Sequence, residues 1–125
     1  AAGIAVTIVT AVNSLGDSGS VTITANHSDT AGNAATQAST SVVKDTALPT
    51  VSITSTPVIN FSNRNAYTFS GTCSDTGQSV SVAVGSTTSS VTCTLLTWSA
   101  TLNVSANADS GTLIITADHT DAAGN

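Results

Sequence analysis

The chain has 125 residues, a net charge of −5 and only 7% charged residues. Its length allows one ordinary domain, or one domain and part of another. The only basic residues are Lys44 and Arg64, and two cations are too few to neutralise the phosphates of a nucleic acid or to bind an anionic membrane surface. The apolar runs are far shorter than the roughly 20 residues of a transmembrane helix. Val, Ile, Thr and Ser dominate and Glu and Met are absent, which favours strands over helices.

Alternation of apolar and polar residues predicts strands along the whole chain. The strands expected before the first proline cover residues 3–12, 20–27 and 35–43. The sequence DTALP at residues 45–49 predicts a boundary, because proline cannot donate a hydrogen bond to a strand ladder. The strands expected after this boundary cover residues 50–54, 66–74, 79–84, 90–95, 98–104 and 112–119.

Four of these strands are expected to bury one face. The residues placed on those faces are Tyr67, Phe69, Gly71 and Cys73, then Val80, Val82 and Val84, then Val91, Cys93 and Leu95, and finally Trp98, Ala100, Leu102 and Val104. Turn sequences such as Asp75-Thr76-Gly77 and Gly85-Ser86 separate the strands. Short strands at this spacing are typical of an all-β sandwich.

Two segments of the chain are nearly the same. Residues 17–33 and residues 109–125 are identical at eleven of 17 positions and lie 92 positions apart. An interval of this length is the size of one immunoglobulin-like sandwich. We therefore expect a tandem repeat of about 92 residues.

The repeat interval suggests how the chain is organised. Residues 1–46 are expected to be the C-terminal part of one repeat, residues 47–49 a linker, and residues 50–125 the next repeat without its last strand. This frame suggests an interior fragment of a longer array. The missing strand should resemble residues 34–44, and an adjacent repeat or a neighbouring chain would supply it.

Cys73 and Cys93 are 20 positions apart and fall on apolar strand faces. No histidine lies near them at the spacing of zinc ligands. We expect a disulfide, with two buried free thiols as the alternative. A disulfide would indicate an oxidising compartment.

The order of motifs resembles a known family. These motifs are the DTALP linker, SGTCSDTG at residues 70–77, VSVAVG at 80–85, Thr97-Trp98, and ITADHTDAAGN at 115–125. Over the whole chain they resemble the bacterial immunoglobulin-like (Big-type) domains that are repeated in tandem along large secreted surface proteins and adhesins.

The resemblance implies an immunoglobulin-like antiparallel β-sandwich without catalytic activity. It would serve as a structural extension module of a bacterial cell-surface adhesin or extracellular filament, secreted or at the cell surface, with adjacent repeats as partners. The alternatives are a glycan- or protein-binding immunoglobulin-like module and an accessory domain of a secreted hydrolase. Trp98 is expected to pack against the disulfide, as in immunoglobulin domains, with a carbohydrate platform as the alternative.

Three aspartates are candidate calcium ligands. Related tandem domains often hold calcium where two domains meet, and calcium takes oxygen ligands. The candidates are Asp29, Asp45 in the linker, and Asp121 at the position equivalent to Asp29. The alternative is ordinary capping of turns by aspartate.

Two further patterns suggest chemistry. His27 and His119 occupy equivalent positions, which allows metal binding or pH sensing, or simply a residue copied with the repeat. The string GDSG at residues 16–19 occurs around the nucleophile of trypsin-like proteases, but that chemistry needs a base and a buried acid from a much larger fold. We expect a turn there and no catalytic residue in the chain.

Overall fold

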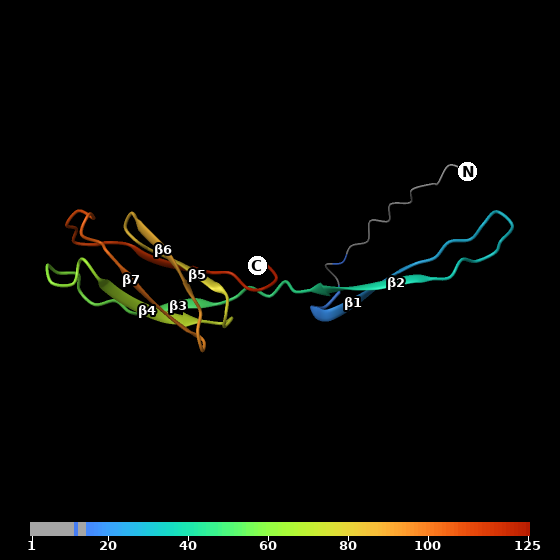
Figure 1. Ribbon diagram of the computed structural model, residues 1–125, viewed down its shortest axis with the longest axis horizontal. Coiled ribbons are helices and arrows are strands. Elements are labelled where there is room, and N and C mark those ends of the chain that lie inside the picture. Colours follow the sequence, from blue (N-terminus) through green and yellow to red (C-terminus); the bar gives the residue numbers. More distant parts are fainter. Residues whose placement is uncertain (1–11, 13–14) are drawn as a thin grey trace. The chain divides into compact units, whose positions relative to one another are not determined.

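The computed structural model describes Val12 and residues 15–125, and the chain divides into two compact units (Figure 1). The first unit is Ala1–Thr46 and the second is Ala47–Asn125. The fold is all-β, as predicted. Its strands are β1 (Ser18–Ala25), β2 (Ala38–Lys44), β3 (Val51–Ser55), β4 (Tyr67–Cys73), β5 (Ser79–Val84), β6 (Thr87–Thr92), β7 (Thr97–Leu102) and β8 (Ile115–His119).

The strand expected at residues 3–12 lies outside the described residues, apart from Val12. In the part of the chain that the structure covers, no helix is long and apolar enough to cross a membrane.

The first unit contains one antiparallel ribbon, in which β1 pairs with β2. The register places Val21 opposite Val42 and Ala25 opposite Ala38, with an irregularity between Ser18 and Val21. Nearly all side chains of the ribbon are exposed, including Ile23 at 52%. The alternating pattern of β1 is therefore present without a second layer from the described residues to cover it.

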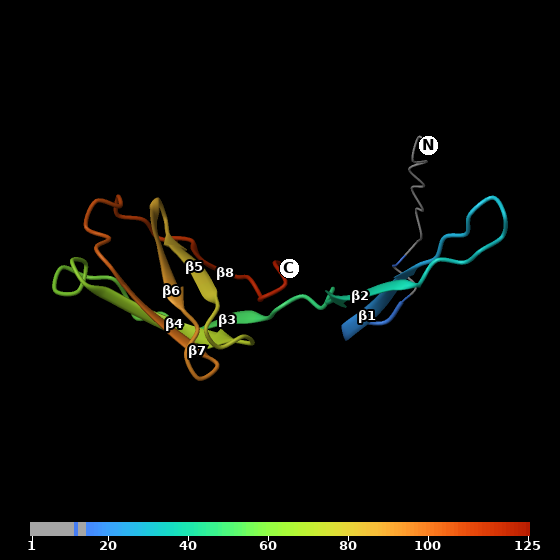
Figure 2. The same ribbon diagram turned by 45° about the vertical axis from the view of Figure 1, so that its right-hand side comes forward.

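The second unit contains two antiparallel sheets, with strand orders β3-β4-β7 and β6-β5-β8 (Figure 2). Their apolar faces meet in one core, which is consistent with a β-sandwich. The buried residues of this core are Tyr67, Phe69, Cys73, Val80, Val82, Val84, Cys93, Trp98, Ala100, Leu102 and Val104. The faces predicted for β4, β5 and β7 are thus the buried ones.

Trp98 anchors one side of this core. Its ring meets Phe69 edge to face, with the ring centroids 5.5 Å apart, and its Nε1 donates to the carbonyls of Ser52 and Thr72 at 3.1 and 3.2 Å. A Cβ on Gly71 would lie 1.7 Å from the Ser52 carbonyl oxygen and 2.7 Å from the indole. Only glycine therefore fits opposite Trp98 in β4. The expected packing of Trp98 against the disulfide stays a prediction.

The predicted disulfide is present between Cys73 and Cys93. Cys73 ends β4 and Cys93 follows β6, so the bond links the two sheets. Both cysteines are buried.

The strand predicted at residues 90–95 is wrong in its bounds. β6 starts at Thr87 because Gly85-Ser86 forms a two-residue hairpin turn, with Gly85 at a φ of 57°. The strand ends at Thr92, and Leu95 is 84% exposed instead of buried.

The exposure of Leu95 has a local cause. Leu95 and Leu96 have φ values of 51° and 63°, and the flanking Thr94 and Thr97 exchange two backbone hydrogen bonds. Positive φ at both central residues is the geometry of a type I′ turn. The run of apolar residues hides this turn, because such turns usually contain Asn or Gly.

Candidate functional site

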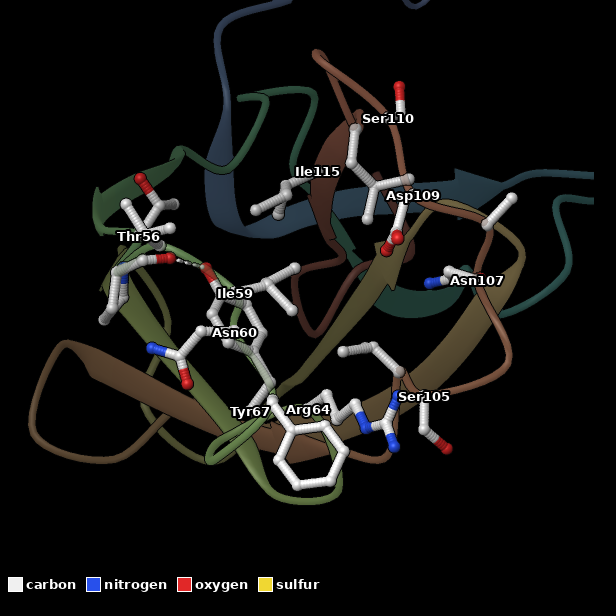
Figure 3. Close-up of a pocket in the computed structure, with 16 residues that line it drawn as sticks. Thr56, Ile59, Asn60, Arg64, Tyr67, Ser105, Asn107, Asp109, Ser110 and Ile115 are labelled. Carbon is white, nitrogen blue, oxygen red and sulfur yellow. Dashed lines mark hydrogen bonds between the residues drawn. The ribbon is translucent and has the colours of Figure 1, made fainter.

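One end of the second unit holds a pocket of about 500 Å³ (Figure 3). Its walls come from the loop before β4 and from the segment between β7 and β8. Tyr67 lines it and donates from its hydroxyl to the Pro57 carbonyl at 2.8 Å, and burial raises the pKa of Tyr67. Asp109 and Ser110 lie on one side, and Asn60 and Arg64 lie across from them.

The rim of this pocket carries an aromatic ring beside a cation. The Arg64 guanidinium carbon lies 4.4 Å from the centroid of the Phe61 ring, and Phe61 is 80% exposed. The Arg64 Nε is buried and has no hydrogen-bond partner among the described residues. Phe61 lies between the strands predicted at residues 50–54 and 66–74, but the sequence gives no indication of its contact with Arg64.

Asp109 is an exposed carboxylate in the same pocket. It forms no hydrogen bond or ion pair with any residue that the structure describes. Ser110 next to it forms a local turn, in which its hydroxyl donates to the Thr112 carbonyl and accepts from the Thr112 N–H. The acceptor oxygens of Asp109 are therefore available to a ligand.

The equivalent aspartate of the first unit, Asp17, is occupied. Its carboxylate accepts hydrogen bonds from the Thr46 N–H at 3.1 Å, from the Thr46 hydroxyl at 2.9 Å and from the Lys44 ammonium at 3.3 Å. These contacts with Thr46, and then Lys44, lower the pKa of Asp17. Ser18 forms the same local turn with Ser20 as Ser110 does with Thr112. The GDSG string is thus a turn whose aspartate clamps the end of β2.

Asp29 and Asp121 have matching hydrogen-bond partners, although Asp29 is exposed and Asp121 is buried. Each accepts two or three backbone N–H bonds through Oδ1 and the side-chain amide of an asparagine four residues later through Oδ2, at 2.8 Å from Asn33 and 2.9 Å from Asn125. Gly32 and Gly124 have φ values of 89° and 93° in these loops. The asparagine side-chain bond is the main cause that lowers the pKa of both carboxyls.

These contacts bear on the calcium hypothesis. Asp29 lies in the loop that joins β1 to β2, whereas Asp45 follows Lys44 at the opposite end of the ribbon. The intervening β2 spans about 20 Å at about 3.3 Å per residue, so Asp29 and Asp45 cannot share one ion within the first unit. In the described part of the chain, no group of three or more His, Cys, Asp or Glu is placed to hold a metal. The geometry of Asp29 and Asp121 is that of turn capping, the alternative kept open above.

The two equivalent histidines differ. The His119 side chain is 0% exposed; its Nε2 accepts the Asp75 N–H at 3.1 Å and its Nδ1 lies 2.8 Å from the Ser79 carbonyl oxygen. Both ring nitrogens are therefore engaged, and Nε2 also lies 3.6 Å from an Asp75 carboxylate oxygen. His27 is exposed. His119 ties the loop after β4 to the end of β8.

The sequence motifs did not single out the group formed by Asp17, Asp109, Lys44 and Thr46. The available signal was the identity of Asp17 and Asp109 in the repeat, combined with the single lysine of the chain at the end of a strand. No family model, no curated protein and no solved structure matches the chain.

Proposed function

We propose that the chain is a structural extension module of a secreted or cell-surface protein, in which immunoglobulin-like sandwiches follow one another in tandem. This role fits the resemblance to the bacterial immunoglobulin-like domains of adhesins and filaments. The disulfide fits an oxidising compartment outside the cytoplasm. In this role the module carries no catalytic residues, and its partners are adjacent repeats or neighbouring chains.

The strand order of the second unit supports an immunoglobulin-like topology. In that fold, strands A, B and E share one sheet, while C, F and G share the other, which C′ can extend. The sheet β3-β4-β7 has the order A-B-E, and the sheet β6-β5-β8 has the order C′-C-F. The position of strand G, next to β8, has no strand from the described residues.

The observation that carries the proposal is a loop whose hydrogen bonds recur at the repeat interval. In the Asp29–Asn33 loop and in the Asp121–Asn125 loop, the aspartate accepts hydrogen bonds from the asparagine side chain and from backbone N–H groups, and both loops contain a glycine of positive φ. The serine turns at Ser18 and Ser110 recur at the same interval. A module whose loops are copied in sequence and in hydrogen bonding is typical of a repeating array.

Scattering from longer arrays tests this role. Chains with one, two and three copies of residues 34–125 should increase in maximum dimension in proportion to the number of copies, because each repeat adds length along one axis. Small-angle X-ray scattering measures this dimension. Growth as the cube root of the mass, which indicates a compact globule, would contradict an extension role.

The pocket favours a second candidate function, the binding of a glycan. Exposed Phe61 with the guanidinium of Arg64 offers a flat apolar surface and a donor group at the rim. Glycan-array binding that is lost in Phe61→Ala but kept in the exposed-turn variant Leu95→Ala would support it. Absence of binding, or equal binding by both variants, would exclude this site.

A further inference from the structure

The first unit contains an aspartate, Asp17, at the position equivalent to Asp109, and its binding partners are visible. Asp17 lies 92 residues before Asp109, in the same Asp-Ser-Gly sequence. It accepts hydrogen bonds from Lys44, the last residue of β2, and from Thr46, two residues later. Lys44 also donates to the Leu15 carbonyl. Asp109 has the same local turn, but among the described residues none supplies these donors.

The strand edge beside Asp109 lacks a partner as well. β8 pairs with β5 on one side, and no described strand pairs with its other side. The β8 segment Ile115–Ala117 corresponds to Ile23–Ala25, which pairs with Ala38–Thr40 in the first unit. An unpaired edge presents a row of backbone donors and acceptors to any extended segment. Its register with a strand like β2 can therefore be copied from the first unit.

That register brings the two features together. It places Thr40 of an added strand opposite Ile115, Val42 opposite Leu113 and Lys44 opposite Ser110. Leu113 and Ile115 pack against the core, so the residues paired with them would lie on the same, inward side of the sheet. Lys44 would then arrive at the free carboxylate of Asp109, with the charges complementary.

We propose that the β8 edge and Asp109 together form a docking site for residues 38–46 of a second copy of this chain. The inference rests on the proposal that the two units derive from one repeated module. The described residues of the first unit form a ribbon of two strands only, and release of a strand from such a ribbon costs little because it is marginally stable in water. Val42, 50% exposed in its own unit, gains cover against Leu113 on docking.

A labelled peptide tests the site in the full chain. A peptide with the sequence of residues 34–48 should bind saturably, as measured by fluorescence anisotropy. Asp109→Asn in the protein, or Lys44→Gln in the peptide, should weaken binding about tenfold, because a charge-assisted hydrogen bond is replaced. The two changes together should weaken it no more than either alone, because they remove the same contact.

Two controls separate this site from general attraction between charges. Asp29→Asn removes the same charge from the loop between β1 and β2 of the first unit, which does not line the pocket, and should leave binding unchanged. Thr40→Pro in the peptide keeps the charge but disrupts strand pairing, and should abolish binding. Absence of saturable binding, equal loss in the Asp109→Asn and Asp29→Asn proteins, or full binding by the proline peptide would overturn the proposal.

The test is independent of the scattering test above. Linear growth of the arrays without peptide binding would overturn only the docking site. Asp109-dependent binding without linear growth would overturn only the extension role.

Discussion

β1 and β8 lie in two segments of closely similar sequence, residues 17–33 and 109–125, but have different surroundings. Ile23 in β1 is half exposed, whereas the equivalent Ile115 packs against the core of the second unit. His27 is exposed, whereas the side chain of His119 is enclosed by the loop after β4 and the start of β5. The alternating pattern is thus the same in both segments, but only β8 has a facing sheet among the described residues, and its apolar side chains pack against the core.

Each strand also has the neighbour that the other lacks. β1 pairs with β2, and its aspartate is satisfied by Lys44 and Thr46. β8 pairs with β5 and faces the sheet β3-β4-β7, but its Asp109 has no partner in the described part of the chain. β1 therefore shows the strand that pairs at one edge of this segment, and β8 shows the strand that pairs at the other edge.

The largest change in the free energy of unfolding should come from loss of the disulfide, which only the second unit contains. Replacement of Cys73 and Cys93 by serine should lower the free energy of unfolding of that unit by about 3 kcal/mol, because the open chain gains entropy when unfolded. Denaturant titration followed by the fluorescence of Trp98, the only tryptophan, measures this. The backbone signals of β1 and β2 in NMR spectra should stay unchanged. A loss below about 1 kcal/mol would indicate that the cross-link contributes little.

His119 and His27 occupy equivalent positions, so substitution of each by alanine compares the contribution of one position to stability in the two units. His119→Ala should lower the free energy of unfolding by about 2 kcal/mol, because it leaves the Asp75 N–H and the Ser79 carbonyl without their partner. His27→Ala, at an exposed position, should change it by less than about 0.5 kcal/mol. Thermal melts of both variants make the comparison. Equal losses would contradict the view that the facing elements set the role of this position.

The smallest change should be a local loosening of the Asp29 and Asp121 loops at low pH, in both units. The pKa values of Asp29 and Asp121 lie below their ordinary value of 3.8, chiefly through the asparagine side-chain bond. A carboxyl with a lowered pKa stabilises its loop above that ordinary value, and the contribution is lost as the pH falls through the lowered pKa. The amide signals of Gly32 and Gly124 in NMR spectra should therefore shift together below about pH 4.

The same signals test for calcium. They should be identical in calcium and in chelator at neutral pH, because loop N–H groups already occupy the carboxylates. A calcium-dependent shift of Gly124 or Gly32 would show that metal competes with turn capping.

The sequence predicted those features that depend on local pattern. Alternation located β5 at its observed bounds and placed Tyr67, Val82 and Trp98 in the core. It misplaced β6, because two leucines in a type I′ turn are indistinguishable by pattern from the inward residues of a strand. Contacts such as those of Asp17 with Thr46 depend on strand register, which one sequence does not give.

The position of the disulfide has a mechanical consequence. If the ends of the second unit were pulled apart, the chain from Cys73 to Cys93 would be bypassed, because the load passes through the sulfur–sulfur bond. About 20 residues at about 3.4 Å each would be withheld from extension, or roughly 70 Å. A stalk built of such units would be shorter and stiffer under load when oxidised, and reduction would release that length one unit at a time.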